Sequence, residues 1–325
     1  MKARWAAIGL AVAGAITAAG AGMELGKGVT VTFLTGKEGG KFLATPDGFT
    51  KSLSPFDRSV RLRVGRAVGE EEFLKHVQAN ALDWTGQEKR RLRLRLGEIR
   101  DKLKGLELPW PKTIFFIKTT GKEDGDAAYT RRNAVVMAAS KLKRNEDSLR
   151  RLLVHELFHV LSRQNPKLAS RLYGIIGYEP APALKFPAEL AARKLTNPDA
   201  PFNRHAIEVE HDGRMVKVMP ILYSRVDKFD EANGGTLFRY LVFRLLVVDG
   251  KDASEAVRDE AGKLILLQPD EAKGFHKKIG RNTGYIIHPE ETMADNFVFL
   301  VVGKKNLANP EIVEKMRAML GGKAE

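Results

Sequence analysis

Short apolar stretches bounded by glycine, proline and charged residues predict strands in several parts of the chain. The segments with this pattern are 28–34, 113–118, 134–138 and a hairpin formed by 206–210 and 215–222. A glycine- and lysine-rich segment at 36–41 predicts a turn. The long apolar segment 236–248 is compatible with either a strand or a buried helix.

Helical spacing of apolar residues is strongest over 145–164. Asn145 or Asp147 can cap the start of this helix, and Pro166 lies just past its end. Its apolar residues cover a broad surface, which predicts a helix deep in the core. The other helical segments are 70–104 with a break near 85–86, a helix-rich stretch up to about 195, a charged helix at 253–264 and an apolar helix at 290–302.

The amino-acid composition narrows the class of protein. The chain has 325 residues, of which 43% are hydrophobic and 29% charged, which excludes a disordered chain, a fibrous repeat and a polytopic membrane protein. The absence of cysteine excludes disulfides and cysteine-ligated metals or clusters. A chain of this length can bury a large core without such cross-links.

The first residues have the pattern of a bacterial-type export signal. A basic start, Met1-Lys2-Ala3-Arg4, precedes an uncharged stretch that runs from Trp5 to Met23. Small residues at Ala19-Gly20-Ala21 suit a signal peptidase, so we expect a signal peptide at 1–21 and an exported protein, periplasmic or secreted. A retained membrane anchor stays open as the alternative, because the stretch is almost long enough to span a bilayer. No cysteine follows, which excludes a lipoprotein anchor.

Basic residues outnumber acidic ones, 54 Lys and Arg against 40 Asp and Glu, so the formal net charge is +14. They are scattered apart from one dense run at 89–95, where interleaved leucines indicate the solvated face of a helix. For an exported protein we expect no nucleic-acid partner. A weak attraction to anionic envelope polymers or lipid headgroups is compatible with this charge.

The segment most informative about chemistry is His155-Glu156-Leu157-Phe158-His159, in the middle of the strongest helix. Two histidines four residues apart lie one turn above the other on the same face of a helix, so both imidazoles can reach a single ion. The carboxylate of Glu156 projects beside that ion and can serve as a base.

These residues resemble the HExxH helix of the zincin metallopeptidases. Ser162 and Asn165 stand where the metzincin branch has a further glycine and histidine, which disfavours that branch. The gluzincin branch takes its third ligand from a downstream Glu that an Asp follows four residues later, a pattern found here at Glu291 and Asp295. The resemblance implies zinc held by His155, His159 and Glu291, with Glu156 as catalytic base and Asp295 accepting a hydrogen bond from a zinc-bound histidine.

Other carboxylates compete for the place of the third ligand. Glu189 is closer in sequence to the histidines, but Arg193 stands where a partner carboxylate would be needed. Glu255 and Asp259 have the required spacing within a segment that looks solvated. Glu290 lacks the partner carboxylate, because Ala294 stands four residues after it. The spacing of Glu291 from Asp295 and its place in the apolar helix at 290–302 therefore favour Glu291 as the third ligand.

A further hydrogen-bond donor usually stabilises the oxyanion of a tetrahedral intermediate. Tyr285 and His288 lie just upstream of Glu291 and are the candidates for this catalytic role, while Tyr223 and His205 stay open as alternatives. The resemblance also implies an edge strand ahead of the active-site helix that pairs with extended substrate, and the segment from Ala128 into 134–137 fits it.

The resemblance implies an α+β, zincin-like fold. We expect a mostly helical region at 22–110, followed at 111–325 by a metallopeptidase domain. In that domain a mixed sheet precedes the HExxH helix, a β-containing elaboration occupies about 197–282, and a C-terminal helical lobe carries Glu291. The expected function is hydrolysis of peptide or protein substrates through a zinc-activated water. A non-catalytic zinc-containing envelope binding or scaffold protein and a zinc amidase acting on cell-wall peptides are the alternatives.

Overall fold

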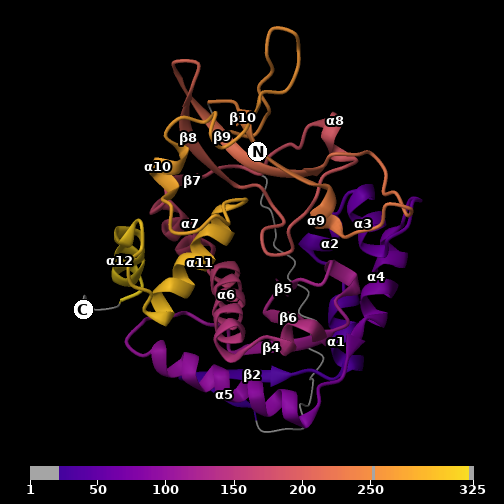
Figure 1. The fold of residues 1–325 in the computed structure, drawn as a ribbon, viewed down its shortest axis with the longest axis vertical. Coiled ribbons are helices and arrows are strands. Elements are labelled where there is room, and N and C mark those ends of the chain that lie inside the picture. Colours follow the sequence, from indigo (N-terminus) through magenta and orange to yellow (C-terminus); the bar gives the residue numbers. More distant parts are fainter. Residues whose placement is uncertain (1–21, 251–252, 322–325) are drawn as a thin grey trace, which may run out of the picture.

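The computed structural model describes residues 22–250 and 253–321 as an α+β protein that contains a mixed sheet, an antiparallel sheet and several helices (Figure 1). The signal peptide predicted at 1–21 lies outside the described residues. Within the described ranges, none of the helices has both the length and the apolar composition that a membrane span requires.

The mixed sheet has the strand order β1-β2-β4-β6-β5, with β3 paired to the end of β4. Its parallel pairs are β2 with β4 and β4 with β6, and its other pairs are antiparallel. The strands are β1 (Met23–Gly26), β2 (Val29–Phe33), β3 (Ala81–Leu82), β4 (Thr113–Thr119), β5 (Ala128–Arg131) and β6 (Ala134–Ala138). The region before residue 110, expected to be mostly helical, therefore also supplies strands to the sheet that holds β4.

Alternating side chains of the central strands bury the two faces of the mixed sheet against different helices, because successive residues of a strand point to opposite sides. One face packs on α5 (Gly86–Lys102) and α6 (Glu146–Gln164), and carries Ile114, Phe116, Val135 and Met137. The other face packs on α1 (Gly36–Ala44), α2 (Gly48–Ser52) and α4 (Glu70–Ala79), and carries Phe115, Ile117, Ala134 and Val136. The short helix α3 (Pro55–Leu62) follows α2.

The antiparallel sheet is a meander in the order β11-β10-β9-β8-β7. Its strands are β7 (Tyr178–Pro180), β8 (His205–His211), β9 (Arg214–Ser224), β10 (Leu241–Val248) and β11 (Leu266–Leu267). β8 and β9 form the expected hairpin, and β10 shows that 236–248 is largely a strand. One face of this sheet joins the core around α6 through Ile207, Val209, Val218 and Leu245.

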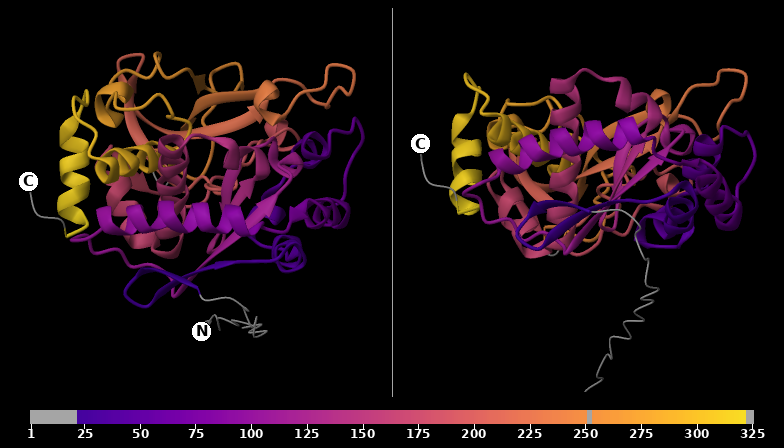
Figure 2. Two further views of the ribbon diagram at one scale, coloured as in Figure 1. Left: turned by 60° about the horizontal axis from the view of Figure 1, so that its bottom comes forward. Right: turned by 90° about the horizontal axis from the view of Figure 1, so that it is seen from below.

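The HExxH helix α6 lies between the two sheets, and α11 (Pro289–Val302) packs along it (Figure 1). α11 in turn packs against α12 (Pro310–Met319), which stands at one side of the molecule near the C-terminal end (Figure 2). The remaining helices are α7 (Pro166–Gly174), α8 (Ala188–Ala191), α9 (Leu237–Tyr240) and α10 (Phe275–Ile279), and the 3₁₀ turns are η1 (Lys122–Asp124) and η2 (Ala139–Lys143).

The turn predicted at 36–41 is wrong, because this segment begins α1. Thr35 caps the helix through its side chain, and the Glu38 carboxylate accepts from the Thr35 backbone N–H, which together form a capping box. The glycines that suggested a turn serve close packing. A Cβ added at Gly39 would lie 2.8 Å from Ile117, and one added at Gly40 would lie 2.8 Å from the Gln78 carbonyl.

The charged helix predicted at 253–264 is also wrong. The Val257 backbone N–H instead donates to the Val247 carbonyl, and the Val257 carbonyl accepts from the Ile265 N–H, which extends the antiparallel sheet. The Asp259 side chain accepts the backbone N–H groups of Ala261 and Lys263 in a tight turn. The stretch up to about 195 contains only the short α7 and α8, separated by β7, so the helix-rich prediction there holds in part.

A buried carboxyl group lies at η1, beneath the end of the mixed sheet. Glu123 is 2% exposed, and Tyr129 Oη donates to Glu123 Oε1 at 3.4 Å. The other carboxyl oxygen, Oε2, is buried without a hydrogen-bond partner among the described residues. Burial raises the pKa of Glu123 from 4.5 to about 7.

The raised pKa predicts that Glu123 makes the protein less stable as the pH rises. Between about pH 4.5 and 7 the folded protein keeps a proton on Glu123 that the unfolded chain releases, so stability falls through this window and is constant above it. A shift of this size corresponds to about 3 kcal/mol. Glu123→Gln should therefore gain about 3 kcal/mol relative to wild type between pH 4.5 and pH 8, measured by urea unfolding. An equal difference between the two proteins at both pH values would contradict this assignment.

Candidate metal centre

The helix α6 positions both histidines because its sequence specifies a capped and deeply buried helix. Asn145 caps its start by accepting the Ser148 backbone N–H at 2.9 Å. Apolar residues on several sides of the helix bury it in the core. The rings of His155 and His159 lie one turn apart, with their centroids separated by 4.6 Å. His159 is 1% exposed, whereas the His155 side chain keeps 15% of its surface open.

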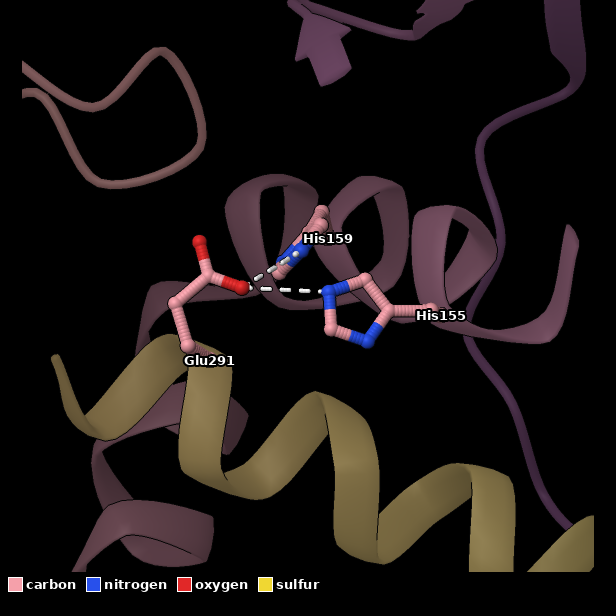
Figure 3. Close-up of side chains that lie close together, drawn as sticks. All are labelled: His155, His159 and Glu291. Atoms are coloured by element: carbon pink, nitrogen blue, oxygen red, sulfur yellow. Dashed lines mark hydrogen bonds and ion pairs between the residues drawn. The ribbon is translucent and has the colours of Figure 1, made fainter. Parts of the chain in front are cut away.

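The helix α11 brings Glu291 between the two imidazole rings. Pro289 occupies its first turn, and apolar residues such as Met293 and Phe297 bury the helix against α6. Glu291 Oε2 lies 3.1 Å from His155 Nε2 and 3.4 Å from His159 Nε2 (Figure 3). The donor atoms of the three residues lie within 4.8 Å of one another, close enough to bind one metal ion.

Each histidine has a carboxylate on its other ring nitrogen. His155 Nδ1 lies 3.1 Å from Asp295 Oδ1, and Thr283 Oγ1 donates to Asp295 Oδ2. His159 Nδ1 lies 2.7 Å from Glu290 Oε1, which also accepts a hydrogen bond from Ser162 Oγ. Such contacts hold the rings in orientation and leave both Nε2 atoms facing Glu291.

Glu290 is a site residue that the sequence reasoning missed, because it was weighed only as a third ligand. Neighbouring residues of a helix point about 100° apart, so Glu290 reaches a different histidine nitrogen from Glu291. The adjacent acidic pair just after Pro289 is a signal that could have identified it. Its distance of 2.7 Å from His159 Nδ1 gives it the same relation to His159 that Asp295 has to His155.

The loop before β8 adds two more residues that the sequence did not indicate. Asn197 Nδ2 donates to Glu291 Oε1, the oxygen that does not face the histidines. Asp199 Oδ1 accepts the Thr130 backbone N–H of β5 at 2.8 Å. A carboxylate oxygen of Asp199 also lies within 4.8 Å of donor atoms of Glu156 and His159. The sequence pattern identified 197–199 only as a loop.

Glu156 is buried beside the histidines, and its Oε2 has no hydrogen-bond partner among the described residues. Burial, followed by repulsion from the charge of Asp199, raises the pKa of Glu156 to about 8. Burial lowers the pKa of His155, but its hydrogen bonds with Asp295 and Glu291 outweigh this and raise it to about 10. The imidazoles therefore carry positive charge that balances the surrounding carboxylates.

This environment fits a divalent metal ion. Two imidazole nitrogens and one carboxylate oxygen are donors that zinc commonly takes in proteins. Burial raises the pKa of Glu291, yet the positive charge of His159 and the hydrogen bond with His155 bring it well below its ordinary value. Glu291 is thus an ionised carboxylate in a buried position, where either the protonated imidazoles or a metal ion bound to their deprotonated Nε2 atoms can balance its charge.

The structure separates the four candidate oxyanion donors. Tyr285 stacks on His155 with ring centroids 6.1 Å apart, and burial together with nearby carboxylates raises its pKa, so its hydroxyl stays protonated. His288 instead caps α11, with its Nδ1 accepting the Glu290 backbone N–H at 3.1 Å. Burial lowers the pKa of His288 to about 3, which leaves it neutral. His205 contacts Ser170 and Tyr173, and Tyr223 lies on β9 under Arg193.

Three of the rival carboxylates, Glu189, Glu255 and Asp259, lie at the surface. Glu189 binds Arg258 at 2.7 Å, and Glu255 binds Lys185 at 2.6 Å. Asp259 holds the turn at 261–263. None of these three belongs to the groups of potential metal ligands found among the described residues.

A cleft of about 620 Å³ leads from the surface to the centre. Ala128 of β5, Tyr285 and Phe299 line it together with His155 and Glu156. Of the four candidate oxyanion donors, Tyr285 lines this cleft, whereas His288, His205 and Tyr223 do not. Comparison of the chain with protein-family models, curated proteins and solved structures found no match.

The choice of third ligand predicts different metal contents for two alanine variants. Glu291→Ala removes the carboxylate that both histidines contact and should reduce bound zinc to less than a tenth of the wild-type stoichiometry. Glu189→Ala removes an exposed ion pair and should leave it unchanged. Elemental analysis after dialysis against zinc measures both. Full zinc content in Glu291→Ala would refute the ligand assignment.

The contact between Glu290 and His159 predicts an effect on metal affinity without direct ligation. Glu290→Ala leaves His159 Nδ1 without its acceptor and should weaken zinc binding about 10- to 100-fold. Glu290→Gln keeps a carbonyl acceptor and should stay closer to wild type. Competition with a chromophoric chelator gives the affinities, and circular dichroism checks the fold. Equal losses of zinc affinity in both variants would show that the hydrogen-bond acceptor on His159 Nδ1 does not determine the affinity.

Proposed function

We propose that the protein is an exported zinc-dependent metallopeptidase with a zincin-like fold of the gluzincin branch. The observation that carries this proposal is the position of Glu291 Oε2 between the two histidine Nε2 atoms, with the buried carboxylate of Glu156 beside them. The resemblance of the HExxH and Glu-x-x-x-Asp segments supports the same conclusion, because α6 and α11 bring these segments side by side. The basic and apolar N-terminal sequence supports export.

In this proposal His155, His159 and Glu291 would hold zinc, with Asp295 and Glu290 fixing the rings of the two histidines. When bound, zinc would act as a Lewis acid and lower the pKa of a water molecule. The pKa of Glu156, which burial and Asp199 raise to about 8, would fall beside a divalent cation, so that its carboxylate can accept the proton of the attacking water and pass it to the leaving amine. Its burial and its unpartnered Oε2 suit a carboxylate that exchanges a proton within a closed site.

Tyr285 is the donor that suits the developing oxyanion. Its ring stacks on His155, and its hydroxyl stays protonated at neutral pH because burial and the surrounding carboxylates raise its pKa. The burial is partial, since 39% of the residue's surface stays exposed, so Tyr285 can also contact a peptide entering the cleft. His288 holds the start of α11 and thereby positions Glu290 and Glu291.

The edge strand β5 offers main-chain groups to an extended peptide. Thr130 donates its N–H to Asp199, away from β6, and residues two apart in an antiparallel strand point the same way. The N–H and C=O of Ala128 therefore also point outward, at the cleft that holds Glu156. A peptide can pair with Ala128, whereas Asp199 already occupies the N–H of Thr130.

Glu156→Gln separates a peptidase from a non-catalytic zinc protein. The variant keeps every proposed ligand, so zinc content should equal that of wild type, while the rate of peptide hydrolysis should fall at least about 100-fold because the general base is lost. Digestion of a broad peptide library measures the rate, and Glu189→Gln is the matched control on the surface. Undiminished cleavage by Glu156→Gln would refute the mechanism. A wild-type protein that binds zinc and cleaves no peptide would favour the binding or scaffold alternative.

A further inference from the structure

The cleft that contains Glu156 continues along α6 toward the start of that helix, where its walls become basic. Lys141 and Arg144, in and just after η2, and Arg151 on α6 line this part of the cleft. Arg151 precedes His155 by four residues and therefore lies one helical turn away from it. The metal end of the same cleft is acidic, with Glu156 and Asp295 in its lining. Asp126 also lines the basic end but pairs with Lys141, so Arg144 and Arg151 leave this end with a net positive charge and the cleft is polarised along its length.

Two of these cations form no ion pair with another described residue. Lys141 binds Asp126 at 3.1 Å, but no such contact involves Arg144 or Arg151, and both are exposed. The acidic residues nearest to them in sequence have other partners. Glu146 binds Arg91 and Arg95, and Asp147 binds Arg150.

The direction of β5 relates this basic end to the direction of a bound peptide. Ala128 lines the cleft together with Arg151, whereas the Thr130 hydroxyl accepts a hydrogen bond from Arg163 near the end of α6. β5 therefore runs in the same direction as α6. Antiparallel pairing is the more stable type of ladder, and a peptide so paired runs opposite to β5. Its C-terminal part then lies beside Arg151 and Arg144.

The spacing sets the distance between the scissile bond and the basic groups. One helical turn is about 5.4 Å, and an extended peptide advances about 3.3 Å per residue. We propose that the preferred substrates carry Glu or Asp two or three residues after the scissile bond, where its carboxylate pairs with Arg151 and Arg144. This inference rests on the proposed peptidase function and adds the class of substrate, an acidic peptide segment.

Two matched peptides test the substrate class. They share one sequence around the bond that the wild-type protein cleaves, and they carry either Glu or Gln at the second and third positions after it. We expect kcat/KM to be about fivefold higher for the Glu peptide, and the difference to shrink in 0.5 M NaCl. Equal rates for the two peptides at low salt would overturn the proposal and leave the peptidase function intact. No cleavage of any library peptide would overturn the peptidase function itself.

Charge reversal tests the residues. The double variant Arg144→Glu/Arg151→Glu should reverse the preference and cleave the Glu peptide more slowly than the Gln peptide, whatever its overall rate. The matched control is Arg90→Glu/Lys102→Glu, which makes the same charge change at exposed positions of α5 that do not line the cleft. This control should keep the preference for the Glu peptide. An unchanged preference in the cleft variant, or an equal loss in both variants, would overturn the assignment.

Discussion

The burial of the Glu291 carboxylate between two imidazoles is the interaction on which the arrangement of α6 and α11 depends. Apolar contacts supply most of the stabilisation between these helices, but a helix with apolar residues on several sides can pack in more than one rotation. A carboxylate removed from water costs several kcal/mol unless a cation and hydrogen bonds meet it. In the observed register Glu291 faces His155 and His159, and Asp295 and Glu290 reach the outer ring nitrogens, so that all five polar side chains have partners.

The antiparallel sheet completes the centre that the two helices begin. The loop leading into β8 places the Asn197 amide on Glu291 and the Asp199 carboxylate on Thr130, which ties the loop to both α11 and the mixed sheet. Arg163, near the end of α6, donates to the carbonyl oxygens of Pro198 and Asp199 and holds the same loop from a third side. The site therefore depends on contacts among segments that lie far apart in the sequence.

Periodicity predicted those features of the fold that local sequence determines. Capping residues and apolar spacing identified α6 and α11, and the turn at 211–213 identified the β8–β9 hairpin. The failures have tertiary causes. Gly39 and Gly40 look like turn residues but allow α1 to approach Ile117 and Gln78, and the charged segment at 253–264 pairs with β10 instead of forming a helix. Asp199 carries no local pattern, since only the packing of its loop on β5 brings it near Glu156.

The nitrogen and oxygen ligand atoms of the centre indicate which metal ion it would bind and whether that ion would be structural or catalytic. Calcium and magnesium prefer oxygen ligands, and a site that directs two imidazole nitrogens at one point favours zinc over either. Structural zinc sites are closed by four protein ligands, whereas catalytic sites use three and leave a position open. Here the group His155, His159 and Glu291 provides three, and the unpartnered oxygen of Glu156 lies next to them beside the cleft. A buried carboxyl oxygen without a hydrogen bond is costly for stability, and in the proposed mechanism proton transfer is the role that accounts for this cost at Glu156.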